Sequence, residues 1–83
     1  MNVTLKLYAT LSDYLPPDAR NNQVQVEVPE DATVGNLIGR YNLPPKLTHL
    51  VLINGHYIAP EARTSTSLRD GDTVAVWPPI AGG

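Results

Sequence analysis

The sequence of 83 residues contains no cysteine, no long apolar run and no concentration of basic residues. Without cysteine, the chain can form neither disulfides nor zinc–thiolate or iron–sulfur sites. No apolar stretch approaches the roughly 20 residues of a membrane span, so we expect no membrane insertion. The six lysine and arginine residues are spread singly and the formal net charge is −2, which argues against nucleic-acid binding.

The length corresponds to one domain. A chain this short buries only about 60–65 % of its unfolded surface, which leaves little core in which to enclose a catalytic cleft. Residues 1–6 alternate between apolar and polar instead of showing a charged start and an apolar run. We therefore expect no signal peptide and a cytoplasmic location.

Alternating apolar and polar residues predict two strands in the first third of the chain. Residues 2–8 alternate with a period of two, which is typical of a half-buried strand and places Tyr8 on its outward face. Residues 23–28 show the same pattern, and the spacing predicts that this strand returns antiparallel to the first. Residues 9–15 are expected to form about one turn of helix before two prolines end it.

One α-helix is expected after Thr33, whose hydroxyl is a good N-cap. The apolar residues that follow are spaced i, i+3, i+4 and i+7 and form one stripe: Val34, Leu37, Ile38 and Tyr41. Gly35 and Gly39 cost the helix up to about 1 kcal/mol each relative to alanine. Close packing of the helix on a sheet is one reason to keep them.

Three further strands are expected in the second half. Residues 50–53 form the first, and Asn54 and Gly55 predict a type I′ hairpin turn, because both central positions of that turn need positive φ. Residues 56–58 form the short return strand. The last strand is residues 73–77, after a turn and an irregular polar segment.

The predicted order is strand, strand, helix, strand, short strand, strand. The simplest packing places the first and last strands side by side in the middle of a mixed sheet, with the helix across it. This is an α+β roll of the β-grasp kind, with four to five strands and one main helix. We assign residues 1–77 to this domain and residues 78–83 to a flexible C-terminal tail.

The tail begins with two prolines, which restrict the backbone, and finishes with two glycines, which have no side chain. It consists of Pro78, Pro79, Ile80, Ala81, Gly82 and Gly83. The prolines favour an extended exit, and residues without a Cβ can enter a channel that side chains would block. Fully extended, the tail reaches roughly 20 Å. We predict that the α-carboxylate of Gly83 is delivered to a site in another protein; the alternative is an ordinary disordered end.

Alternation also predicts a patch on the outward face of the sheet. It places four large side chains there: Tyr8, Leu52, Tyr57 and Trp77. Clustered exposed apolar groups usually mark an interface, and Trp and Tyr are typical hot-spot residues. We predict a partner interface; the alternative is ordinary sheet side chains covered by loops.

Five segments together resemble the MoaD/ThiS family of ubiquitin-like sulfur carriers. They are residues 3–9, 33–37, 51–55, 68–72 and 78–83. The resemblance covers nearly the whole chain and includes the terminal glycine pair. The two prolines at the start of the tail and the longer loop after the first strand are more similar to the small subunits of molybdopterin synthase than to the thiamine carriers.

The resemblance implies a chain that is not itself an enzyme and binds no cofactor. In this family, an adenylyltransferase related to ubiquitin-activating enzymes uses ATP, with Mg, to adenylate the equivalent of Gly83. A sulfur donor then converts the adenylate to a thiocarboxylate, which donates sulfur inside the large synthase subunit or another acceptor enzyme. The outward patch would dock these partners, and no side chain of this chain would be catalytic.

Three functions remain open on the sequence. The first is a sulfur carrier, for molybdopterin or for another pathway such as thiamine, tRNA thiolation or cysteine. The second is a ubiquitin-like modifier conjugated to lysines through Gly83. The third is a non-covalent interaction module with an incidental tail.

Two weaker signals do not predict metal sites. His49 and His56 lack a third ligand at a metal-like spacing, so we expect both to face solvent. Residues 70–72, Asp-Gly-Asp, lack the ligand series and closing glutamate of a calcium loop, so we predict a turn.

Overall fold

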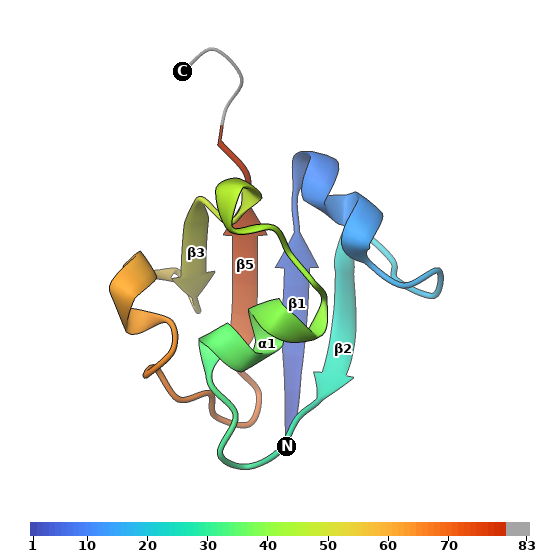
Figure 1. Cartoon of the computed structure of the whole chain (residues 1–83). Helices are drawn as coiled ribbons and strands as arrows, with labels where there is room; N and C mark the ends of the chain where they lie inside the picture. The colour runs from blue at the N-terminus through green and yellow to red at the C-terminus, as the bar shows by residue number, and fades with distance from the viewer. Residues whose placement is uncertain (80–83) are drawn as a thin grey trace.

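The computed structural model describes residues 1–79, which form a mixed five-stranded sheet with the α-helix on one face (Figure 1). The strands are β1 (Asn2–Leu7), β2 (Gln23–Glu27), β3 (Leu50–Ile53), β4 (His56–Tyr57) and β5 (Thr73–Trp77). Their order across the sheet is β2-β1-β5-β3-β4. The first and last strands are therefore neighbours, and the predicted α+β roll of the β-grasp kind is confirmed.

The pairing of the strands follows the predicted scheme. β1 and β5 run parallel, with Leu5 opposite Val74, whereas β1 and β2 are antiparallel. β3 pairs antiparallel with both β5 and β4. At the turn between β3 and β4, φ is 50° at Asn54 and 86° at Gly55, so the predicted turn with two positive φ values is confirmed.

Helix α1 (Val34–Arg40) begins with a reciprocal cap. The hydroxyl of Thr33 accepts the Asn36 N–H at 3.1 Å, and the Asn36 side chain accepts the Thr33 N–H at 2.9 Å. Together they satisfy two of the backbone N–H groups at the helix start. The predicted N-cap is confirmed, and the predicted apolar stripe faces the core, with Val34 and Leu37 fully buried.

The expected reason for the two helix glycines is wrong. A Cβ on Gly35 would lie 3.2 Å from the Cα of Thr64 and 3.3 Å from the carbonyl oxygen of Arg63, so Gly35 packs on a loop instead of the sheet. A Cβ on Gly39 would meet nothing within 4 Å. Of the two helix glycines, only Gly35 allows another part of the backbone to approach the helix closely.

Three short 3₁₀ helices complete the described chain: η1 (Ala9–Tyr14), η2 (Pro45–Leu47) and η3 (Pro60–Ala62). The first confirms the predicted helical turn, and its Leu11 is fully buried. The last lies in the segment predicted to be irregular. Neither η2 nor η3 has a side-chain cap, and both start with a proline, whose fixed φ suits the first position of a helix.

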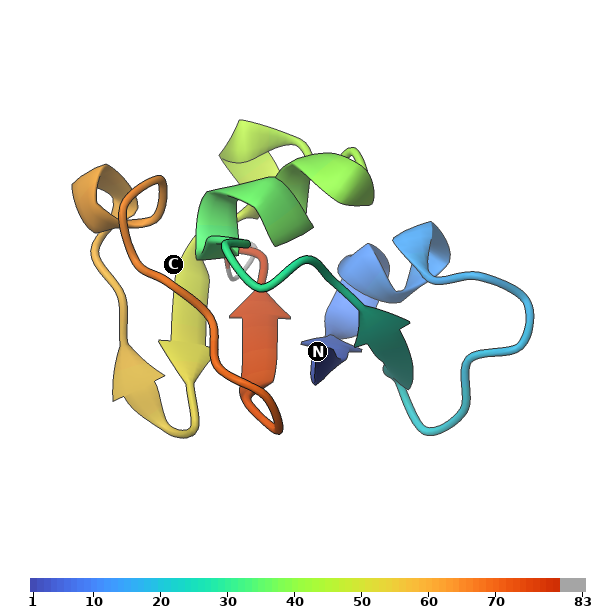
Figure 2. The same ribbon diagram turned by 90° about the horizontal axis from the view of Figure 1, so that it is seen from below.

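The two faces of the sheet differ (Figure 2). Helix α1 and η2 cover one face, where the inward residues of β1, β3 and β5 form the core with the helix. The other face carries no helix within residues 1–79. None of the helices in these residues has the length and apolar character needed to cross a membrane.

Candidate functional site: the open face and the start of the tail

One row of side chains on the open face runs across four strands. Ala75 of β5 lies opposite Lys6 of β1 on one side and opposite Leu52 of β3 on the other, and Leu52 in turn pairs with Tyr57 of β4. Directly opposed residues bring their Cβ atoms to about 5 Å. The strand register therefore places Leu52 and Tyr57 within contact distance of each other. Tyr57 is 57 % exposed to solvent.

A second row lies two residues along the strands and carries the aromatic pair. Leu50 is opposite Trp77, and Tyr8 continues the pairing beyond β1, because its N–H donates to the Val76 carbonyl at 3.1 Å. The rings of Tyr8 and Trp77 stack with centroids 4.2 Å apart and planes 3° from parallel. Residues two apart on a strand are about 7 Å apart, so the two rows form one patch.

The structure thus brings the four predicted patch residues onto one face in two neighbouring pairs. Tyr8, Leu52 and Trp77 are half-buried and Tyr57 is exposed. We call this set, with Leu50 and Ala75, the open-face patch. Its role as an interface stays a prediction, and its geometry is that of an accessible surface with a stacked aromatic pair at one end.

Leu50 and Ala75 also belong to this surface, although neither was among the predicted patch residues. Leu50 shares the outward parity of Leu52, and Ala75 shares that of Trp77, so the same alternation could have found both. Ala75 is only 9 % exposed although it lies on the open face. A small side chain surrounded by larger ones forms a shallow floor for the patch.

The tail starts beside the aromatic pair. The Trp77 carbonyl accepts the His49 N–H at 3.1 Å, which holds the end of β5 to the segment before β3. Pro78 is half-buried and Pro79 is exposed, and neither belongs to a strand. The predictions for Ile80, Ala81, Gly82 and Gly83 lie outside the described residues.

The weak metal signals resolve into ordinary surface features. His49 and His56 are exposed, as expected. The Asp70 carboxylate accepts the Asn2 N–H at 2.7 Å, and that of Asp72 accepts the Arg69 N–H at 2.8 Å, so the predicted turn is confirmed. Within residues 1–79, no group of three His, Cys, Asp or Glu side chains is placed to hold a metal ion.

A β-grasp sheet with one α-helix across it, and with β5 ending beside an aromatic patch on the open face, is the fold of a small ubiquitin-like protein. The model of the ThiS family matches residues 5–83. The chain therefore belongs to the ThiS family, whose members, like the related MoaD and ubiquitin-like modifier proteins, are sulfur carriers or modifiers and are generally non-catalytic. The comparison with curated proteins found no significant match.

Solved structures of the same fold span the full chain. The HVO 2177 protein of Haloferax volcanii is 29 % identical with a TM-score of 0.78, covering 100 % of this chain and 87 % of its own. SAMP1 of the same organism, a small archaeal modifier protein, is 28 % identical with a TM-score of 0.68 and covers 100 % of both chains. A chain from the complex of subunits 1 and 2 of the Helicobacter pylori molybdopterin-converting factor is 18 % identical, with a TM-score of 0.63 and full coverage of both chains; this likeness concerns the fold alone.

Proposed function

We propose that this chain is a sulfur carrier that works through the α-carboxylate of Gly83. The observation that carries the proposal is the extent of the family match, which runs to the terminal glycine pair and so includes the residues that would be charged. The position of the open-face patch, next to the start of the tail, supports it. A partner enzyme that binds the patch would receive the tail at a defined place.

The chemistry explains why partners are needed. A carboxylate is a poor electrophile because its leaving group would be oxide. A partner adenylyltransferase joins the Gly83 carboxylate to the α-phosphate of ATP, held with Mg, and releases pyrophosphate. The persulfide of a sulfur donor then attacks the acyl carbon and AMP leaves, which gives an acyl disulfide. A thiol reduces this disulfide by forming a new disulfide with the donor's sulfur, and the thiocarboxylate remains on Gly83. The product is a soft nucleophile that donates its sulfur to an acceptor.

We propose molybdopterin synthesis as the pathway, with a large synthase subunit as the acceptor. The proline pair at the start of the tail and the long loop after β1 support this choice, because both are similar to the small synthase subunits. The same fold also occurs in the Helicobacter pylori complex named above. In such an assembly the open-face patch would contact the large subunit while the tail reaches its active site.

A protein modifier is the second candidate, and one observation favours it. SAMP1, called a small archaeal modifier protein, aligns over its full length at 28 % identity. The activated acyl group is the same in both functions. If a lysine amine attacks it instead of sulfur, AMP leaves and an isopeptide bond to Gly83 forms.

Intact mass separates these candidates. The chain is incubated with ATP, Mg, its activating enzyme and a sulfur source, and a parallel reaction omits ATP. A mass increase equal to oxygen replaced by sulfur supports the carrier, and high-mass conjugates support the modifier. Both products must disappear when Gly82 and Gly83 are deleted. An unmodified chain whose function survives that deletion would leave only a non-covalent module.

A further inference from the structure

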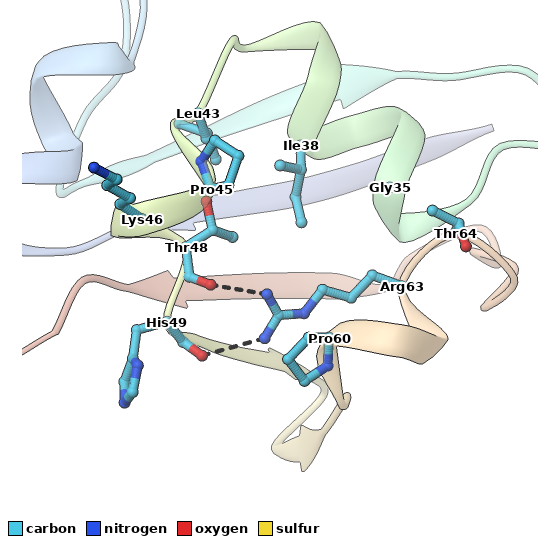
Figure 3. A pocket seen from close by; sticks show the side chains of 10 residues that line it. All are labelled: Gly35, Ile38, Leu43, Pro45, Lys46, Thr48, His49, Pro60, Arg63 and Thr64. Carbon is cyan, nitrogen blue, oxygen red and sulfur yellow. Dashed lines mark hydrogen bonds between the residues drawn. The ribbon is translucent and has the colours of Figure 1, made fainter.

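A second surface lies on the helix side of the sheet, away from the open-face patch. It is a groove of about 530 Å³ between α1, η2 and the segment that follows η3 (Figure 3). Its apolar lining comes from Ile38, Leu43, Pro45 and Pro60. The groove is partly open to solvent and is not an enclosed cavity. An open apolar groove of this kind suits an extended segment better than a small molecule, which sites normally bury almost completely.

The groove wall contains a buried cation. Arg63 is only 8 % exposed. Its Nη1 donates to the Thr48 carbonyl at 2.8 Å and its Nη2 to the His49 carbonyl at 3.2 Å (Figure 3). Its Nε donates to the Ile58 carbonyl at 3.3 Å. Every acceptor is a neutral carbonyl. Burying a charge is costly without hydrogen bonds, and these bonds use three of the guanidinium's donors but bring no opposite charge. A guanidinium has five N–H groups, so each Nη keeps one more.

The other charged lining residue has the same sign. Lys46 of η2 is exposed at the rim of the groove, and no Asp or Glu is among the lining residues. The chain as a whole has eight acidic and six basic residues and a net charge of −2. The groove is therefore a locally basic site on an acidic protein, and its two cations attract a group of opposite charge.

The groove also begins next to the start of the tail. Its lining residue His49 donates its N–H to the Trp77 carbonyl, two residues before Pro79. A segment bound in the groove would lie on the helix side of the sheet, while the open-face patch lies on the opposite side. A partner that uses both surfaces would hold the end of β5 from two sides.

We propose that this groove binds a short acidic and aliphatic peptide segment of a partner protein. Aliphatic side chains of the segment contact Ile38, Leu43 and Pro60, and a carboxylate faces Arg63 and Lys46. The inference does not depend on whether the chain carries sulfur or modifies proteins, because it rests only on the groove. A bare anion would leave the apolar lining uncovered, and an uncharged peptide would leave the cations unpaired.

The test uses the purified chain and defined peptides. A six-residue peptide of alternating glutamate and leucine, capped at both ends, is titrated to several millimolar into the ¹⁵N-labelled protein. Shifts should concentrate on η2, on α1 around Ile38 and on Arg63 and Thr64, and spare the open-face patch. The matched peptide of alternating glutamine and leucine should bind about five-fold more weakly, and raising the salt should weaken the acidic peptide selectively.

Lys46→Glu is the matching change in the protein, because Lys46 is exposed and its replacement leaves the fold intact. It should weaken the acidic peptide about five-fold or more, whereas Lys6→Glu on the opposite face should have no effect. Arg63→Ala is unsuitable, since it also removes three bonds between loops. The proposal would be overturned if both peptides bound equally, if free glutamate alone gave equal shifts, or if the Lys46→Glu variant bound the acidic peptide as well as the unchanged protein does. Shifts on the open face, or no shifts at all, would also overturn it.

Discussion

The two faces of the sheet are built from the same strands but differ in how far their side chains are buried. On the helix side, Leu5, Val51 and Val74 are completely buried. On the open side, Leu52 and Trp77 remain half-buried, and Tyr57 is exposed. Since successive side chains of a strand point to opposite faces, each strand contributes to both surfaces at once.

This comparison separates stability from recognition. The buried face removes apolar area from water and so provides most of the folding free energy. The open face leaves large apolar and aromatic groups partly in water, which costs solubility unless a partner covers them. A small protein can in this way use one face of its sheet to fold and the other to be recognised.

The largest expected effect is on stability, when a leucine is truncated to alanine on each face of the sheet in turn. Leu5→Ala removes a fully buried leucine and should lower the free energy of unfolding by about 2–5 kcal/mol. Leu52→Ala removes a half-buried one and should cost about 1 kcal/mol. Urea unfolding of both variants measures the difference. Equal losses would show that the open face is part of the core.

The second effect concerns binding instead of folding. Trp77→Ala should weaken the complex with the activating enzyme or synthase subunit about 30-fold or more, because a central aromatic anchor contributes about 2 kcal/mol or more. Losing the stack on Tyr8 should lower stability by only about 0.5–1.5 kcal/mol. Titration calorimetry gives the affinity, and an NMR spectrum checks the fold.

Gln25→Ala provides the control for Trp77→Ala. Gln25 is exposed on β2, two strands away from β5, and its loss should leave the affinity unchanged. Two results would contradict the assignment: global unfolding of Trp77→Ala, which would make Trp77 a core residue, or undiminished affinity.

The third effect tests how tightly the helix side is packed. Gly35→Ala should destabilise the protein by about 1 kcal/mol, because the new Cβ would press on the backbone of residues 63–64 and outweigh the gain in helix propensity. Gly39→Ala meets no neighbour and should stabilise it by up to about 1 kcal/mol. Thermal unfolding compares the two. Stabilisation by both changes would show that the loop yields freely.

The smallest effect on stability is expected at the most exposed member of the patch. Tyr57→Ala should change the free energy of unfolding by no more than about 0.5 kcal/mol, since 57 % of the residue is already in water. If Tyr57 lies at the rim of an interface, partner affinity should fall by a few-fold only. Chemical denaturation and calorimetry on the same sample test both statements. A large loss of stability would show that Tyr57 does not serve partner binding alone.

Much of the fold was predictable because its signals are local. Strand alternation, the Thr33 cap and the Asn54 and Gly55 turn depend on residues within a few positions of one another, and each was found in its expected place. The patch followed from the same alternation. What local patterns could not predict was the role of Gly35, because its contact is with a loop almost 30 residues further along the chain.

Arg63 shows the same limit more sharply. It stands in a polar segment that the sequence marks only as irregular, and a lone arginine there is normally solvated. The fold buries it against carbonyls from residues 48, 49 and 58. No local pattern predicts such a site, because its acceptors come from backbone groups whose positions depend on the packing of η2 and β3.

The amino-acid sequence by itself determined the element order and the parity of each strand, since periodicity and conformational preference act over a few residues. The tertiary structure alone decided that Tyr8 stacks on Trp77 and that β5 ends beside His49. It also decided that the buried guanidinium of Arg63 lines a groove on the helix side of the sheet, opposite the open-face patch. These features join residues far apart in the chain, and only the closing of the sheet and the docking of the helix bring them within contact distance.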